Sequence, residues 1–373
     1  MKKSYLFILV LFSLLFAACS SQPAPNNVVT SWSEEDLNKF VNEMSQDVSG
    51  LANQSLSGLS ILNAIPANSP IKDLGLLSTL SSLDNPKTLL KSFTQPSIIV
   101  QDASHYAALP RGKWQYNPKT GNWGSLGDSD DLVLVYPIQN PDFTTSMVQA
   151  IFDWNANAPS IKVMTPGGKV EVPTDMKVRV LLDGKELGAL SLISKWYQGC
   201  GYKTLEPTQV KLKGDFSLDG TSLNFALNLN TQVHSASEET LKLDGFVKLA
   251  VGEDYGKFSI DTSLDANVNR NSDCFLEDIK LNQGRIAAEL DTFIAGEHNS
   301  LGISFAFDNP QLSATGAYSV KVKNGKITAN GATVVSFAGI LDDANLNGVP
   351  GENLIITFDD GSSSTFEAIL LSL

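Results

Sequence analysis

Histidine and cysteine are scarce in this sequence, with three residues of each among 373. His105, His234 and His298 are far apart, and none belongs to a spacing that zinc sites use. The sequence also lacks a Gly-x-Ser-x-Gly nucleophile elbow, a P-loop and a His-Glu-x-x-His motif. We therefore expect a protein that is not an enzyme. The alternative is a hydrolase that uses two of the many carboxylates, which sequence alone does not reveal.

Basic residues are also few relative to acidic ones. Lysine and arginine number 27 against 40 aspartates and glutamates, so the formal charge is −13, which makes nucleic acid an improbable partner. The hydrophobic share of 42% is too high for a largely disordered chain. The glycines lack the strict period of a collagen, and the composition is that of a folded protein with a sizeable core.

Long apolar runs are missing except at the N-terminus. Lys2 and Lys3 precede an apolar run over 5–16, which is too short for a confident membrane-spanning helix and typical of a secretory signal. The sequence Phe-Ala-Ala-Cys that ends at Cys19 resembles the lipobox of bacterial lipoproteins. This resemblance implies a signal peptide over 1–18, lipidation of Cys19 and an exported protein anchored in the bacterial membrane. Ser20 and Ser21 resemble the context that directs such proteins to the outer membrane or cell surface.

The residues that follow change character twice. Polar residues with Pro23 and Pro25 make 19–31 a flexible tether. Residues 32–105 then form a helical segment, which begins with a capping box at Ser33 and Asp36. Its apolar residues recur along one helix face, and shorter helices are expected over 71–83 and 86–93. We expect this face to pack on the β body, although a helix lying on a membrane surface would share the pattern. The face comprises Leu37, Phe40, Val41, Met44, Val48 and Leu51.

Residues 106–373 alternate between apolar and polar side chains, as in half-buried strands. Asp183-Gly184, Asp219-Gly220 and Asn324-Gly325 each separate two such runs and predict two-residue hairpin turns. The fold class is therefore mainly β with an N-terminal helical part. About fourteen strands between Asp131 and Leu373 would form an antiparallel meander, as a curved sheet, sandwich or open barrel, with a possible subdivision near residue 200. In architecture only, such a sheet resembles half-barrel carriers that move lipids or lipoproteins across the periplasm.

The two remaining cysteines, Cys200 and Cys274, are predicted to form a disulfide, because exported proteins occupy oxidising surroundings. The bond would close a loop of about 74 residues and contribute about 4 kcal/mol on the chain-entropy estimate. Two free thiols, or a metal pair, are the alternatives.

Oxygen-bearing side chains alternate in the segment Asp343-x-Asn345-x-Asn347-Gly, with Glu352 shortly after it. The segment resembles the first half of an EF-hand calcium loop, which implies calcium as a structural cofactor. It departs from that family at the twelfth position, where Leu354 replaces glutamate. An Asn-Gly turn between strands is the alternative.

Two further segments have two interpretations each. Trp114, Tyr116 and Trp123 flank a Pro-containing turn, where they could stack on sugar rings or pair across a hairpin, and we favour the hairpin. The acidic run of Asp128, Asp130 and Asp131 is a solvated loop or a second cation site.

These observations favour a non-enzymatic binding or carrier module for an apolar ligand, attached to the membrane through its N-terminal lipid. The alternative is a structural or adhesive surface protein that uses the exposed β face for protein or glycan partners. An apolar cavity would distinguish the two, since a carrier needs one.

The calcium hypothesis predicts that Asp343→Ala weakens calcium binding and lowers the melting temperature in the presence of calcium. Calorimetric titration and thermal melts with and without calcium measure both. If neither quantity changes, the segment is a polar turn and no metal site.

Overall fold

The computed structural model describes residues 31–58, 111–139, 143–154, 161–165, 168–172, 174–197, 206–235, 237–270, 276–312, 318–343, 349 and 351–368. Several sequence predictions lie outside these residues: the signal peptide over 1–18, Cys19 and the tether, the helices over 71–83 and 86–93, both cysteines of the predicted disulfide, and Asn345 and Asn347.

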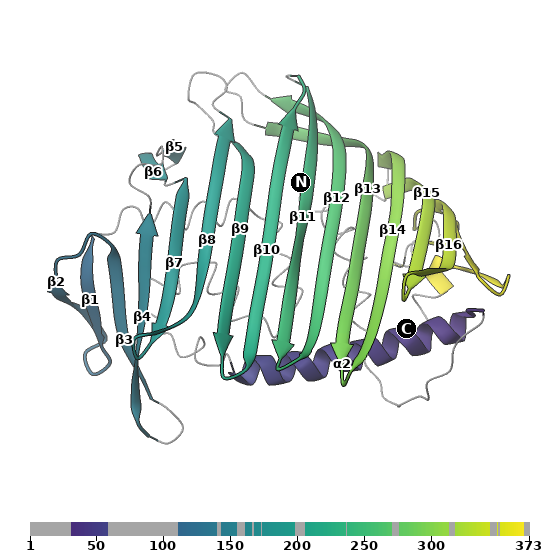
Figure 1. Ribbon diagram of the computed structural model, residues 1–373. Coiled ribbons are helices and arrows are strands. Elements are labelled where there is room, and N and C mark those ends of the chain that lie inside the picture. Colours follow the sequence, from purple (N-terminus) through teal and green to yellow (C-terminus); the bar gives the residue numbers. More distant parts are fainter. Residues whose placement is uncertain are drawn as a thin grey trace. The chain divides into compact units, whose positions relative to one another are not determined.

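The described residues are mostly β, with one long helix (Figure 1). They belong to two compact units. The described residues of the first unit lie within Met1–Leu51, Asn230–Lys248 and Gly252–Leu373, and those of the second lie within Ala52–Leu229 and Leu249–Val251. Within the residues described, no helix combines the length and the apolar character needed to cross a membrane.

The strands of the second unit follow in space the order β10-β9-β8-β7-β4-β3-β1-β2. The pairs β1–β2, β3–β4, β4–β7, β7–β8 and β8–β9 are antiparallel, and β1 and β3 are parallel. Two further strands, β5 and β6, form a separate hairpin. The bounds are β1 (Gly112–Asn117), β2 (Asn122–Gly127), β3 (Leu132–Gln139), β4 (Thr145–Trp154), β5 (Ile161–Thr165), β6 (Gly168–Val172), β7 (Asp175–Leu182), β8 (Lys185–Tyr197), β9 (Glu206–Leu218) and β10 (Thr221–Val233).

The strands of the first unit follow the order β18-β17-β16-β15-β14-β13-β12-β11. From β12 to β18 each strand pairs antiparallel with the one before it. The predicted large antiparallel meander is confirmed. The sheet is not closed, because in the strand order of the described residues β2 and β18 each have a single neighbour. The bounds are β11 (Glu238–Val251), β12 (Asp254–Arg270), β13 (Leu276–Ile294), β14 (Glu297–Leu312), β15 (Tyr318–Ala329), β16 (Ala332–Leu341), β17 (Leu354–Phe358) and β18 (Ser363–Thr365).

Helix α2 (Glu34–Gly58) begins at the predicted capping box. The Asp36 amide donates to Ser33 Oγ at 3.2 Å, and the Ser33 amide donates to Asp36 Oδ2 at 3.0 Å. The Ser33 hydroxyl also donates to this carboxylate and lowers the pKa of Asp36. These bonds satisfy donors at the helix start that have no partner within the helix. Of the predicted apolar face, Leu37, Met44 and Leu51 are buried.

Two of the three predicted hairpin turns are confirmed. Asp183 and Gly184 have φ of 48° and 83°, and Asp219 and Gly220 have φ of 48° and 80°. Positive φ at both central residues is what a two-residue turn between twisted strands requires, and Asp-Gly adopts it at little cost.

The third predicted turn, Asn324-Gly325, is wrong. Asn324 does adopt a φ of 51°, but it lies inside β15, where the pairing with β16 shifts register between Val322 and Gly325. The chain reverses later, at Asn330 and Gly331, with φ of 50° and 80°. A glycine is needed at 325 because the Phe337 ring lies against the backbone there: a Cβ built on Gly325 would lie 2.2 Å from Cδ2 of that ring. An Asn-Gly pair thus marks a β-bulge here.

This close approach predicts that Gly325→Ala destabilises the protein. The Phe337 ring is buried and lies beside the Phe305 ring, with centroids 6.0 Å apart, so it has little room to move. We expect a loss of about 1–3 kcal/mol in the free energy of unfolding, as for other overpacked cores. Urea unfolding measures it.

Gly50→Ala is the control for this substitution, because Gly50 lies in α2 with nothing within 4 Å of an added Cβ. It should leave the protein unchanged or more stable by up to about 1 kcal/mol. An unchanged midpoint for Gly325→Ala would contradict the described contact with Phe337.

Candidate functional site

The two faces of the first unit's sheet differ in chemistry. Opposite residues of paired strands point to the same face, so Gly256, Thr292 and Asn299 share one face and Tyr255, Phe293 and His298 share the other. A Cβ on Gly256 would lie 3.5 Å from Val48 Cγ2 and 3.7 Å from Leu51 Cδ1. We call the face beside these helix residues the helix face, and the opposite one the polar face.

The helix face is largely apolar, although Thr292 and Asn299 also lie on it. Leu264, Ile286 and Phe305 on this face are buried, as are Phe337 and Ile356 farther along the sheet. A second group of large apolar side chains on the same face is only half-buried, which leaves part of each accessible to solvent. The register pairs Phe258 with Leu290 and Ile303 with Ile327 in this group. We call it the apolar band; it consists of Phe258, Ile260, Leu290, Ile303 and Ile327.

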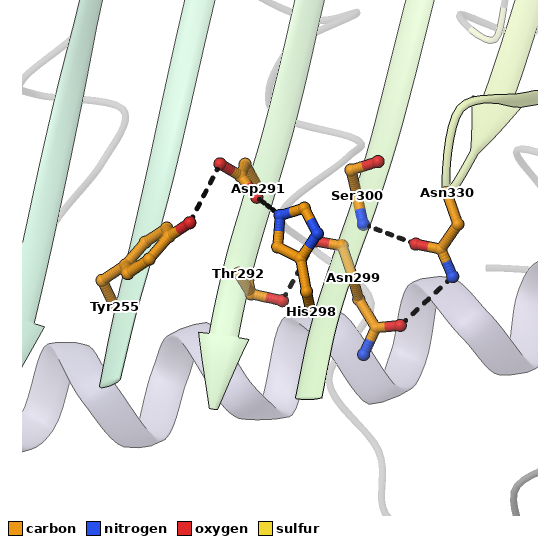
Figure 2. Close-up of polar contacts among 7 residues, drawn as sticks. All are labelled: Tyr255, Asp291, Thr292, His298, Asn299, Ser300 and Asn330. Atoms are coloured by element: carbon orange, nitrogen blue, oxygen red, sulfur yellow. Dashed lines mark hydrogen bonds and ion pairs between the residues drawn. The ribbon is translucent and has the colours of Figure 1, made fainter. Parts of the chain in front are cut away.

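The polar face carries a cluster centred on Asp291 (Figure 2). His298 Nε2 lies 2.5 Å from Asp291 Oδ1, and the Tyr255 hydroxyl donates to Asp291 Oδ2 at 3.5 Å. The Tyr255 ring stacks on Phe293 with centroids 6.0 Å apart, and Lys248 Nζ lies 3.8 Å from the Tyr255 centroid. The cluster therefore links four strands of the unit through one carboxylate and one aromatic pair.

Burial raises the pKa of Tyr255, and the negative charge and hydrogen bond of Asp291 raise it further. The His298 side chain is 58% exposed, so its contact with Asp291 contributes little in water. Tyr255 and His298 both contact Asp291, and these contacts order the polar face.

Next to this cluster, amide side chains stabilise the turn between β15 and β16 (Figure 2). The Ser300 amide donates to Asn330 Oδ1 at 2.8 Å, and Asn330 Nδ2 donates to Asn299 Oδ1 at 3.3 Å. Asn330 is one of the two turn residues with positive φ, so these bonds stabilise the turn.

A second polar network contains another of the three histidines. The Thr240 hydroxyl donates to Asp265 Oδ1 at 2.7 Å, and Gln283 Nε2 donates to Asp265 Oδ2 at 2.7 Å. Because the Thr240 proton points to Asp265, His234 Nε2, 2.8 Å from the same hydroxyl, acts as a donor. The bonds from Thr240 and Gln283 lower the pKa of Asp265. Since His234 donates to the Thr240 hydroxyl, it does not accept a proton from it, and this hydroxyl donates to Asp265. The arrangement favours a structural role for the network.

The aromatic residues singled out from the sequence form the predicted hairpin. Tyr116 on β1 pairs with Trp123 on β2, and their ring centroids lie 5.3 Å apart. Trp114 pairs with Ser125 on the same two strands. The Asn117 side chain accepts from the Lys119 amide at 3.0 Å and stabilises the turn.

The acidic run joins β2 to β3. The Asp131 amide donates to Ser129 Oγ at 3.2 Å, and Arg111 donates to the Asp130 carbonyl at 2.9 Å. Asp128 and Asp130 are exposed, as expected for a solvated loop.

The predicted calcium segment is described only in part. Asp343 and Glu352 are among the described residues, whereas Asn345 and Asn347 lie outside them. The preceding Asp342 accepts from Asn353 Nδ2 at 3.0 and 3.2 Å. Within the described residues, no group of three or more histidine, cysteine, aspartate or glutamate side chains is placed to hold a metal. Calcium binding stays a prediction.

The sequence did not reveal the Asp291–His298 pair. These residues meet because β13 and β14 pair with Phe293 opposite His298, across a turn at Ala295 and Gly296. Ala295 has a φ of 54°, which is uncommon for a residue other than glycine, asparagine or aspartate. Apolar runs on both sides of Gly296 were the available signal for a hairpin.

The cluster predicts that Asp291→Asn lowers the pKa of Tyr255. The substitution removes the charge and the carboxylate that oppose ionisation of the phenol, and the burial effect remains. The raised pKa also has a consequence for stability: its contribution is present below about pH 10 and is lost as the pH rises through the pKa of the folded state.

A spectrophotometric titration of phenolate absorbance, taken as the difference from Tyr255→Phe, measures this pKa. His298→Ala is the control, since it leaves the Tyr255–Asp291 contact in place and should keep the pKa raised. An identical Tyr255 titration in the wild type and Asp291→Asn would contradict the described contact.

We found no family model, curated protein or solved structure that matches this chain. The functional proposal therefore rests on the chemistry of the described side chains and on the sequence.

Proposed function

We propose that this protein is an exported, lipid-anchored protein of the bacterial cell envelope that binds an apolar ligand and catalyses no reaction. The observation that carries the proposal is the apolar band on the helix face of the first unit. The ligand would lie along this band, beside the α2 residues that approach Gly256. We include in the proposal that the N-terminal helical segment covers part of this face.

The apolar band favours a ligand with hydrocarbon character. Phe258, Ile260, Leu290, Ile303 and Ile327 project from four neighbouring strands of one face and stay half-buried. Covering apolar surface contributes about 25 cal/mol per Å², so a ligand that covers about 200 Å² gains on the order of 5 kcal/mol before association costs. An acyl chain offers this area without polar groups that need partners.

The anchor follows from the lipobox-type sequence that ends at Cys19. The formal charge of −13 supports a body that stays off an anionic membrane surface while its lipid is inserted. A body attached in this way can exchange an apolar ligand with the membrane beside it.

The polar networks support a role without catalysis. In the first unit, Asp291 accepts from Tyr255 and contacts His298, and Asp265 accepts from Thr240 and Gln283. Each carboxylate is thus engaged in cross-strand bonds that order the sheet.

The second candidate is a structural or adhesive role for the polar face. The observation that favours it is the exposed charge on this face, which includes the ion pair of Lys323 on β15 with Asp308 on β14. Partners would then bind to the polar face and leave the apolar band unoccupied.

The proposal predicts that the chain from Ser20 onward, exported with a cleavable leader, carries a bound lipid. Native mass spectrometry should show an added mass that solvent extraction releases. The double variant Phe258→Ser with Leu290→Ser should lose the added mass and bind the probe 1-anilinonaphthalene-8-sulfonate roughly tenfold more weakly, a difference of about 1.4 kcal/mol.

The matched control changes the other face of the same strands, with Ser259→Ala and Ala287→Ser. It should keep both the added mass and the probe affinity. A bare wild-type protein whose probe affinity is the same in both double variants would exclude a ligand on the apolar band and favour the second candidate.

A further inference from the structure

Strand β2 (Asn122–Gly127) lies at one edge of the sheet. It pairs with β1 and has no second neighbour in the strand order of the described residues. Five of its six residues are exposed, and Leu126 is 52% exposed. Natural edge strands are commonly guarded by charged residues, proline, short length or a β-bulge. The pairing with β1 does shift register at Leu126, between the pairs Trp114–Ser125 and Lys113–Gly127, so the regular part of β2 is short. The sequence of β2, NWGSLG, contains neither a charged residue nor proline. By contrast, β18 at the other end of the order has only three residues.

We propose that β2 is an interface for a second copy of this chain, and that two β2 strands pair antiparallel about a two-fold axis. Such an interface is isologous: the same residues contribute from both copies. It goes beyond the proposed ligand binding and does not depend on it.

The side chains of β2 suit this self-pairing. With Ser125 on the axis, Trp123 lies opposite Gly127 of the second copy, and Leu126 lies opposite Gly124. A Cβ built on Gly124 or Gly127 would meet nothing within 4 Å, so there is open space above both glycines. Each large apolar side chain of one copy thus covers the bare backbone of the other, a pairing known to stabilise glycines in strands.

The charges at the two ends of β2 suit an antiparallel partner. Lys119 lies in the turn before β2, and Asp128 and Asp130 lie in the loop after it. All three residues are exposed. Antiparallel pairing places the Lys119 end of each copy beside the acidic end of the other. This local complementarity favours the antiparallel arrangement over a parallel one, which would bring like charges together.

Cysteine cross-linking of the full chain in intact bacterial cells tests the interface. Ser125→Cys places a cysteine on the axis, and opposite residues of an antiparallel pair have Cα atoms about 4.5–5.5 Å apart, within the range that a disulfide spans. We expect a dimer band on non-reducing gels that is several-fold stronger than in the wild type. The matched control is Ile193→Cys, which is 43% exposed on β8 but has paired strands on both sides. It should give the wild-type background.

Charge exchange provides a second readout. In the Ser125→Cys background, Lys119→Glu should weaken the dimer band several-fold, and adding Asp128→Lys should restore it. Leu126→Lys should abolish the band, because it places a charge opposite Gly124 of the second copy.

A Ser125→Cys band no stronger than that of Ile193→Cys would overturn the proposal, and so would a band indifferent to both Lys119→Glu and Leu126→Lys. If Ser125→Cys instead cross-links to a different protein in the cells, the β2 edge accepts a foreign strand and self-pairing is rejected.

Discussion

Successive side chains of a β-strand point to opposite faces of the sheet, so the register of the strand pairs decides which residues share a face. The rest of this structure depends on that constraint. In the first unit, the register of β12, β13 and β14 places Gly256, Thr292 and Asn299 on the helix face. The same register places Tyr255, Asp291 and His298 on the polar face. A slip of one residue would exchange the two sets, which would bury Asp291 and expose Leu290. The apolar band and the polar cluster are therefore fixed by one register.

The two faces contribute to the fold in different ways. The helix face buries apolar area, which is the main source of stability, and Gly325 lets the Phe337 ring approach the backbone closely. The polar face contributes cross-strand bonds around Asp265 and Asp291 that select the register. Proposed ligand binding uses the first face, whereas proposed self-pairing uses the backbone edge of the second unit. The two proposals therefore draw on separate surfaces.

Local signals in the sequence predicted the elements that local chemistry decides. Ser33 and Asp36 cap a helix within four residues, and Asp183-Gly184 and Asp219-Gly220 form turns whose geometry needs only two residues. Prediction failed where residues distant in the sequence determine the local conformation. Asn324-Gly325 has the sequence of a turn, but the Phe337 ring and the pairing of β15 with β16 make it a bulge. The Asp291–His298 pair could not be predicted either, because the turn between them uses Ala295 at positive φ.

The nearly sequential strand order also bears on how the chain reaches its native state. From β8 onward, each strand pairs with the one synthesised just before it, so every new hairpin closes a short loop at low entropic cost. The sheet can therefore grow by adding strands to its most recent edge while the rest of the chain is still being made. Until the last strand is added, that edge exposes unpaired backbone groups and is a site for misassembly. The three residues of β18 end this growth, because they offer a following chain too little backbone to pair with.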